Sequence, residues 1–118
     1  MKRLAGAAAA LLLAAAPACA QQAFRWDGAA TVTLSATATT SRAQVQTAEG
    51  GSQAVRVYNA GTVPVFVACG TVIVVATVAA GLPIAPGSVE VLGCNQTHIA
   101  GITSTGTATV YLTAGTGL

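Results

Sequence analysis

The chain has 118 residues, a mean hydropathy of +0.68 and only 7% charged residues. This length predicts a single domain, and low charge combined with many β-branched residues argues against a disordered chain. Two of the five basic residues, Lys2 and Arg3, lie at the extreme N-terminus, so the remaining three are balanced by three acidic residues. A neutral body offers no basic stripe for phosphates, which argues against nucleic-acid binding.

Residues 1–20 have the pattern of a signal peptide. A short basic start precedes the apolar run Leu4–Ala16, and small residues before Gln21 form a cleavage site near Ala20. We therefore expect a helical signal peptide and an exported chain, periplasmic or extracellular, with no membrane span after cleavage. Two alternatives stay open, namely lipidation at Cys19 and retention of the N-terminal helix.

Residues 21–30 form a lead-in segment that contains Trp26. Its aromatic side chains predict either a flap that covers the core or an anchor for a partner. The domain proper is expected over 31–118.

The body of the chain has the period-two alternation of β-strands and no convincing helical pattern. Short strands separated by turn residues at regular spacing predict an all-β fold, a single small β-sandwich (jelly-roll-like) or barrel of about seven to eight antiparallel strands. The expected strands cover 31–36, 43–47, 54–58, 63–70, 71–78, 88–92, 97–102 and 107–113.

The segment Ala54–Gly70 is predicted to be a hairpin at the centre of a sheet, with a four-residue turn around Asn59 and Gly61. Pro83 cannot donate to a strand ladder, so its strand is expected at an edge or corner. In the strand over 88–92, Val89 and Val91 are expected to face inward and Glu90 outward.

A transmembrane helix is the rival interpretation of the uncharged segment Val63–Ala85, which is long enough to cross a bilayer. Pro64 and Gly70 interrupt it, however, and β-branched residues are dense within it. Two adjacent core strands produce the same hydropathy, and we favour strands.

Cleavage of the signal peptide would leave two cysteines, Cys69 and Cys94. In an oxidising compartment we expect a disulfide between them, closing a loop worth roughly 3.5 kcal/mol. The alternative is a pair of buried free thiols that pack as small hydrophobic residues.

The body offers little catalytic chemistry. His98 is the sole histidine, and the three carboxylates are far apart in sequence. We therefore predict no catalytic residue, no metal site and no cofactor, and a chain that is not an enzyme. The remaining candidates are contacts to a protein partner or to a second copy, at Trp26, Tyr58 and Tyr111. Any small-molecule ligand stays unknown, and threonine-rich outer faces are equally compatible with a solvated sheet.

Four stretches of the chain resemble small all-β proteins encoded in the structural regions of tailed phages and prophages. The resemblance covers 54–118 and lies in Val55–Val63 with Val65–Val67, in Leu82–Ile84 with Pro86–Val91, in Thr97–Ala100 and in Thr107–Tyr111. It implies a non-enzymatic virion-associated role, as a head decoration or fibre-like protein docked on a larger assembly. The signal peptide departs from that family, because phage shells assemble in the cytoplasm. The alternative function is an exported periplasmic or cell-surface β-domain that binds a protein or carbohydrate.

Overall fold

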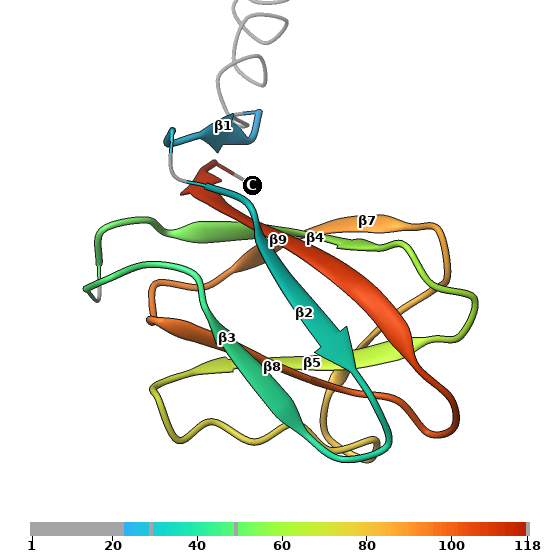
Figure 1. Cartoon of the computed structure of the whole chain (residues 1–118). Helices are drawn as coiled ribbons and strands as arrows, with labels where there is room; N and C mark the ends of the chain where they lie inside the picture. Colours follow the sequence, from blue (N-terminus) through green and yellow to red (C-terminus); the bar gives the residue numbers. More distant parts are fainter. Residues whose placement is uncertain (1–22, 29, 49, 118) are drawn as a thin grey trace, which may run out of the picture.

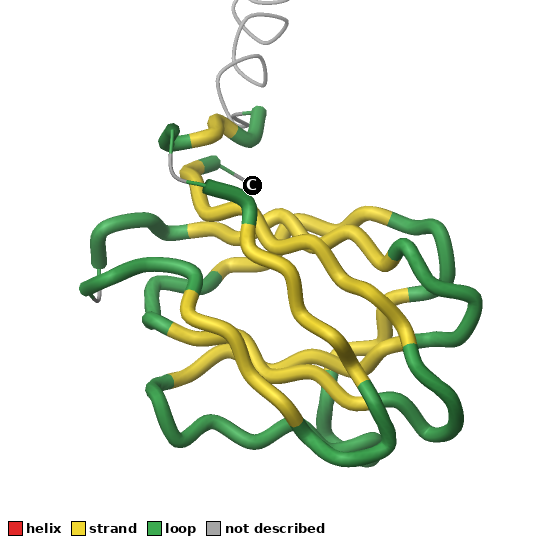
Figure 2. Tube along the Cα trace, viewed as in Figure 1, coloured by secondary structure: helices red, strands yellow, loops and turns green. Residues whose placement is uncertain are grey.

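The computed structural model of the chain describes residues 23–28, 30–48 and 50–117. The predicted signal peptide, with its possible cleavage, lipidation or retention, lies outside these residues. The described part is all-β and contains nine strands, more than the seven to eight predicted (Figures 1 and 2). They are β1 (Arg25–Trp26), β2 (Val32–Ala36), β3 (Ser41–Gln44), β4 (Ala54–Asn59), β5 (Val65–Gly70), β6 (Leu82–Ile84), β7 (Val89–Gly93), β8 (His98–Ile102) and β9 (Ala108–Thr116).

The strands form two antiparallel sheets. In the five-stranded sheet, β1 and β2 pair with one side of β9, β4 pairs with its other side, and β7 lies beyond β4. The four-stranded sheet has the order β3-β8-β5-β6. Figure 1 shows the two sheets facing each other, with β9 and β4 in the upper one.

The eight strands from β2 through β9 pair in a nested order. The outermost strands pair with each other, β2 with β9, and so do β3 with β8, β4 with β7 and β5 with β6. Only β5 and β6 are both consecutive in the chain and paired. Most neighbours in space are therefore distant in sequence.

One hydrophobic core lies between the sheets. The predicted alternation in the last strand is confirmed, because Ala108, Val110 and Leu112 are buried while Thr109 and Tyr111 are exposed. The buried core side chains come from both sheets and comprise Leu34, Ala36, Val45, Val55, Val57, Val65, Val67, Ile84, Cys94, Ile99, Ala108, Val110 and Leu112.

The predicted hairpin over Ala54–Gly70 is wrong, because β4 and β5 belong to different sheets. Its turn residues instead form a crossing between the sheets. The fully buried side chain of Asn59 donates from Nδ2 to the carbonyl oxygens of Val63 (2.9 Å) and Ile84 (3.0 Å). Its Oδ1 accepts the amide N–H of Gly61 at 2.9 Å. These three hydrogen bonds hold the turn that follows β4, where the chain crosses to the other sheet and β5 begins.

The predicted strand over 71–78 is also wrong, since these residues form turns and irregular structure. Val74 folds back on β5, where a Cβ added to Gly70 would lie 2.8 Å from it. The segment passes along the outer side of the four-stranded sheet (Figure 1, yellow). There Arg42 Nη1 donates to the carbonyl of Val74 (3.0 Å), and Thr40 Oγ1 accepts the N–H of Ala76 (2.9 Å). Over the described residues, no helix has the length and apolar character needed to cross a membrane.

The predicted facing of the strand over 88–92 is reversed. Val89 pairs with Tyr58, whose side chain lies on the outer side of the sheet, and Glu90 pairs with the core residue Val57. Glu90 is nevertheless exposed, because β7 is an edge strand. The core contact from β7 comes from Leu92.

Of two further strand predictions, the first is shifted along the chain and the second is confirmed. The strand expected over 43–47 is β3, Ser41–Gln44, and Val45 just beyond it is buried. The prediction for Pro83 is confirmed, because β6 is a three-residue edge strand.

The predicted disulfide between Cys69 and Cys94 is confirmed, with a Cα–Cα distance of 6.0 Å. Cys69 lies in β5 of the four-stranded sheet, and Cys94 follows β7 of the five-stranded sheet. The bond therefore joins the two sheets covalently.

Candidate docking face of the five-stranded sheet

The strand register brings Tyr58 and Tyr111 side by side. They are directly opposite in the β4–β9 ladder, with ring centroids 6.1 Å apart and ring planes inclined by 19°. Each is flanked along its strand by buried residues whose side chains enter the core, so the tyrosines project from the outer side of the sheet. Tyr111 is 40% exposed. Alternation along two strands thus creates an aromatic pair on a rigid surface.

Neighbouring strands extend this pair into a continuous face. Val89 lies opposite Tyr58 on β7, and Thr33 lies opposite Tyr111 on β2. The adjacent row, one step along the strands, contains Thr113, Arg56 and Val91. We call this surface the tyrosine face, and its members are Thr33, Arg56, Tyr58, Val89, Val91, Tyr111 and Thr113.

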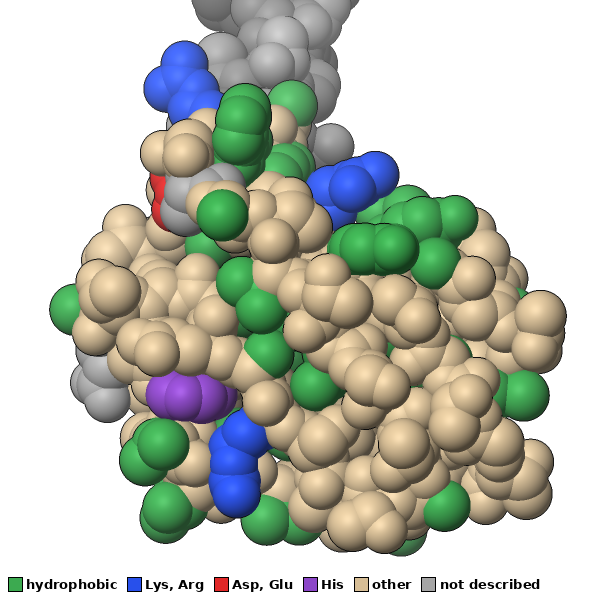
Figure 3. All heavy atoms as spheres, viewed as in Figure 1, with side chains coloured by type: hydrophobic (Ala, Val, Ile, Leu, Met, Phe, Trp, Pro, Cys, Tyr) green, Lys and Arg blue, Asp and Glu red, His purple; other side chains and the backbone are tan. Residues whose placement is uncertain are grey.

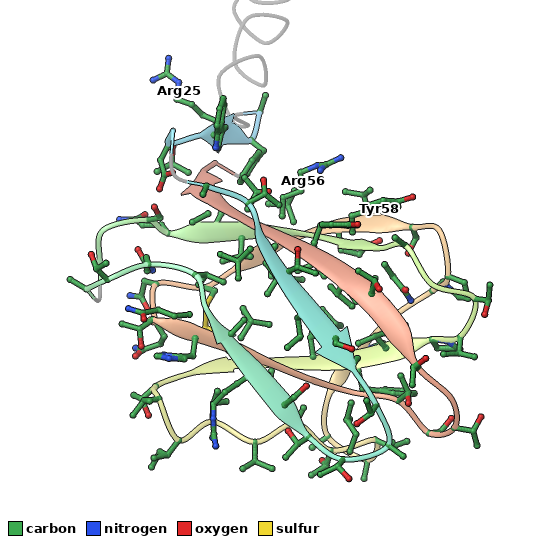
Figure 4. All side chains as sticks on the ribbon, in the orientation of Figure 1. Arg25, Arg56 and Tyr58 are labelled. Atoms are coloured by element: carbon green, nitrogen blue, oxygen red, sulfur yellow. A yellow bond between two sulfur atoms is a disulfide. The ribbon has the colours of Figure 1, made fainter. Side chains whose placement is uncertain are left out.

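The exposed guanidinium of Arg56 lies beside the tyrosines. Figure 4 shows Arg56 and Tyr58 projecting from β4 on the side away from the other sheet. In the space-filling view, the cation borders a group of hydrophobic side chains (Figure 3). An aromatic pair, an aliphatic rim and a planar cation form a surface suited to protein contact.

Trp26 lies apart from the tyrosine pair. It is 62% exposed and pairs with Gly115, which puts it on the same side of the sheet as Tyr111. The two positions are four residues apart along β9, or roughly 13 Å. In the lead-in segment it is Phe24 that covers the sheet, because a Cβ at Gly115 would lie 2.6 Å from its ring. Phe24 thus lies on the same outer side of the sheet as Trp26, so the flap over the core and the anchor for a partner both stay predictions.

Two of the edge strands, β7 and β6, are poorly suited to pairing with another strand. Glu90 is a charged residue on the core-facing side of edge strand β7, and β6 is short and contains Pro83. Natural proteins use inward charges, proline and short edge strands to prevent edge-to-edge pairing. A partner strand is therefore not expected to pair with β7 or β6.

A groove of about 450 Å³ lies elsewhere, between the segment around Asp27 and the loop that ends at Ser52. The hydroxyl of Ser52 donates to the carboxylate of Asp27. Gln46 Nε2 donates to the carbonyls of Ser52 (3.2 Å) and Gln96 (2.7 Å), and its Oε1 accepts the N–H of Ser52 (2.6 Å). Sequence reasoning missed Gln46, whose amide is fully used in holding two loops together.

The groups considered for chemistry remain scattered. Within the described ranges, no three His, Cys, Asp or Glu residues come close enough to hold a metal ion. His98 is half-buried on β8, and its Nδ1 shares a 2.7 Å hydrogen bond with the hydroxyl of Thr97. This contact holds the imidazole against its own strand.

Comparison of the chain with models of protein families, with curated proteins and with solved structures found no match. The residues of the tyrosine face and the strand topology therefore carry the functional argument.

Proposed function

We propose that this chain is a non-enzymatic assembly protein that docks on a larger protein surface through the tyrosine face. The observation that carries the proposal is the stacked pair of exposed Tyr111 and half-buried Tyr58, with the exposed Arg56 beside it. Tyrosine and arginine are enriched among the residues that dominate binding energy at protein interfaces. Both tyrosines stand on paired central strands, so little conformational entropy is lost when a partner binds.

The strand order supports an assembly role by analogy. We assign the two facing sheets to the β-sandwich class and the nested pairing of β2 to β9 to the jelly roll, in which eight strands pair in this order. Jelly rolls build viral capsids and also lectins. A fold does not determine a function, so the analogy favours two partner classes, and the residues of the face must decide between them.

The partner that we favour is the particle of a tailed phage or prophage. This choice rests on the resemblance of residues 54–118 to small phage structural proteins, which have no catalytic residues to carry over. The aliphatic rim formed by Val89 and Val91 fits a protein surface better than a carbohydrate, because a sugar needs many hydrogen-bonding groups.

The second candidate is an exported periplasmic or cell-surface domain that binds a protein or a carbohydrate. It is favoured by the bond between Cys69 and Cys94, since disulfides persist in oxidising compartments. In this interpretation residues 1–20 direct export and the mature chain begins at Gln21.

Intact-mass analysis of the natural chain separates the two candidates. We expect the chain in purified phage particles, and a mass that starts at Met1 there would support assembly without export. A chain that starts at Gln21 in the periplasm or medium, and is absent from particles, would refute the phage assignment and favour the second candidate.

Variants of the face test the docking surface itself. Tyr58→Ser with Tyr111→Ser should lower the occupancy of purified particles at least about tenfold, because each tyrosine is a candidate hot spot. Thr105→Ala, in the exposed turn before β9, is the control and should leave occupancy unchanged. Full occupancy by the double tyrosine variant would exclude the tyrosine face as the docking surface.

A further inference from the structure

The loop between β5 and β6, which we call the apolar loop (residues 71–81), exposes aliphatic side chains to solvent. Val72 is 63%, Ile73 77% and Val75 56% exposed, and Val78 and Leu82 at the start of β6 are also exposed. The loop lies on the four-stranded sheet, on the opposite side of the molecule from the tyrosine face (Figure 1). The docking function proposed above does not account for it.

The body of the protein holds the apolar loop in one conformation. Besides the bonds from Arg42 and Thr40, the amide of Val74 donates to the carbonyl of Thr71 (3.0 Å) and that of Gly81 to the carbonyl of Thr77 (2.8 Å). Ala76 in the middle of the loop is buried. Its exposed side chains are therefore presented on an ordered backbone, and a partner would bind them at a small cost in entropy.

The exposed apolar surface is about as large as the largest apolar patch on a typical monomer, and such patches are often functional. The five exposed side chains together amount to nearly three fully exposed aliphatic residues, on the order of 400 Å². Monomeric proteins rarely expose contiguous apolar patches larger than a few hundred Å². Figure 3 shows hydrophobic side chains at the lower margin of the view, where the loop runs in Figure 1.

We propose that the apolar loop is a two-fold contact between two copies of this chain. Residues 71–82 contain no ionisable side chain, so the side chains of the loop itself can face their own copy without repulsion between like charges. The one cation described at this surface is the guanidinium of Arg42, which the Val74 carbonyl holds against the loop. A two-fold interface requires such self-complementarity. A lipid surface fits less well, because interfacial segments rely on tryptophan, tyrosine and basic residues, and this stretch has none of them.

The area sets the strength of this contact. Two apolar patches bury on the order of 800 Å² together, and the exposed threonines and alanines of the loop bring the total to about 1,000 Å², the lower limit for a specific interface. The dimer is therefore weak and forms at high concentration or when the chains are held close together.

Sedimentation equilibrium of the disulfide-bonded chain, over a concentration series up to about 1 mM, tests the contact. We expect the average mass to rise from one chain toward two. Ile73→Ser combined with Val75→Ser should weaken the association at least about tenfold. Thr105→Ala, in the exposed turn before β9, lies outside both surfaces; it is the control and should leave association unchanged.

Three results would overturn the proposal. They are a monomer at every concentration, a dimer that the loop variants do not weaken, and Ile73-dependent binding to phosphatidylcholine vesicles without dimer formation. The variants change exposed side chains, so an unchanged melting temperature verifies that they fold. The tyrosine face takes no part in this measurement, and particle docking can fail or succeed independently of it.

Discussion

Replacing Asn59 by aspartate is the most direct test of how the two sheets are connected. The native amide donates two hydrogen bonds, to the carbonyls of Val63 and Ile84, and accepts one from Gly61. Aspartate has the same shape, but its ionised carboxylate cannot donate. Both carbonyls would lose their donor, and a charge without a counter-ion would lie about 3 Å from them.

The magnitude follows from these contacts. Two buried carbonyls without a donor cost about 1–3 kcal/mol each, and burial of the charge adds to this, so we expect Asn59→Asp to lose at least about 4 kcal/mol at pH 7. Such a loss lowers the melting temperature by roughly 16–32 °C in a domain of this size. The exposed Asn95→Asp is the matched control and should change stability by no more than about 0.5 kcal/mol.

The variant should also acquire a specific pH dependence. Burial raises the folded-state pKa of the new carboxyl above its unfolded value, because the neutral form is favoured in the core. The variant is then most stable below the unfolded pKa and loses stability as the pH rises through the folded pKa. The difference from the native protein should therefore be smaller at pH 4 than at pH 7, since a protonated carboxyl can donate one of the two lost bonds.

Thermal unfolding at the two pH values, each with the native chain as reference, measures both effects. Asn59→Ala separates the lost hydrogen bonds from the charge, and its loss of stability should not depend on pH. An aspartate variant within 1 kcal/mol of the native protein at pH 7, or a difference that is the same at both pH values, would refute the assigned role of this amide.

Two further predictions concern the link between the sheets and their packing. Cys69→Ala with Cys94→Ala should lower the free energy of unfolding by about 3.5 kcal/mol, measured by urea denaturation, and dithiothreitol should then have no further effect. Gly101→Ala should cost about 1–3 kcal/mol by the same measurement, because its Cβ would lie 2.8 Å from Leu34 Cδ2, whereas the nearby exposed Thr105→Ala should be almost neutral.

Strand periodicity was predictable where one face of a strand is clearly more apolar than the other. In β9 the alternation of Ala108, Val110 and Leu112 with threonine and tyrosine has a single consistent phase. In β7 the phase is ambiguous, because Val89 and Val91 compete with Leu92 for the core. In the structure Leu92 packs against the core, and Glu90, on the same side of this edge strand, remains exposed to solvent.

Strand pairing was less predictable, because local signals do not identify distant partners. The turn chemistry of Asn59 and Gly61 was recognised, but the same residues can turn a chain within a sheet or between sheets. The β-branched segment 71–78 has high strand propensity and yet forms a loop, since β6 and β8 already occupy both sides of β5. The contact between Tyr58 and Tyr111 depends on the same long-range register.

The position of β9 limits the order in which the strands of its sheet can pair during synthesis. The last strand of the chain is also the middle strand of its sheet, where β1 and β2 meet it on one side and β4 on the other. Until β9 leaves the ribosome, β1 and β2 have no partner strand in that sheet, whereas β4 can already pair with β7. The strands β1 and β2 therefore join their sheet only in a late step, after the whole of β9 has been made.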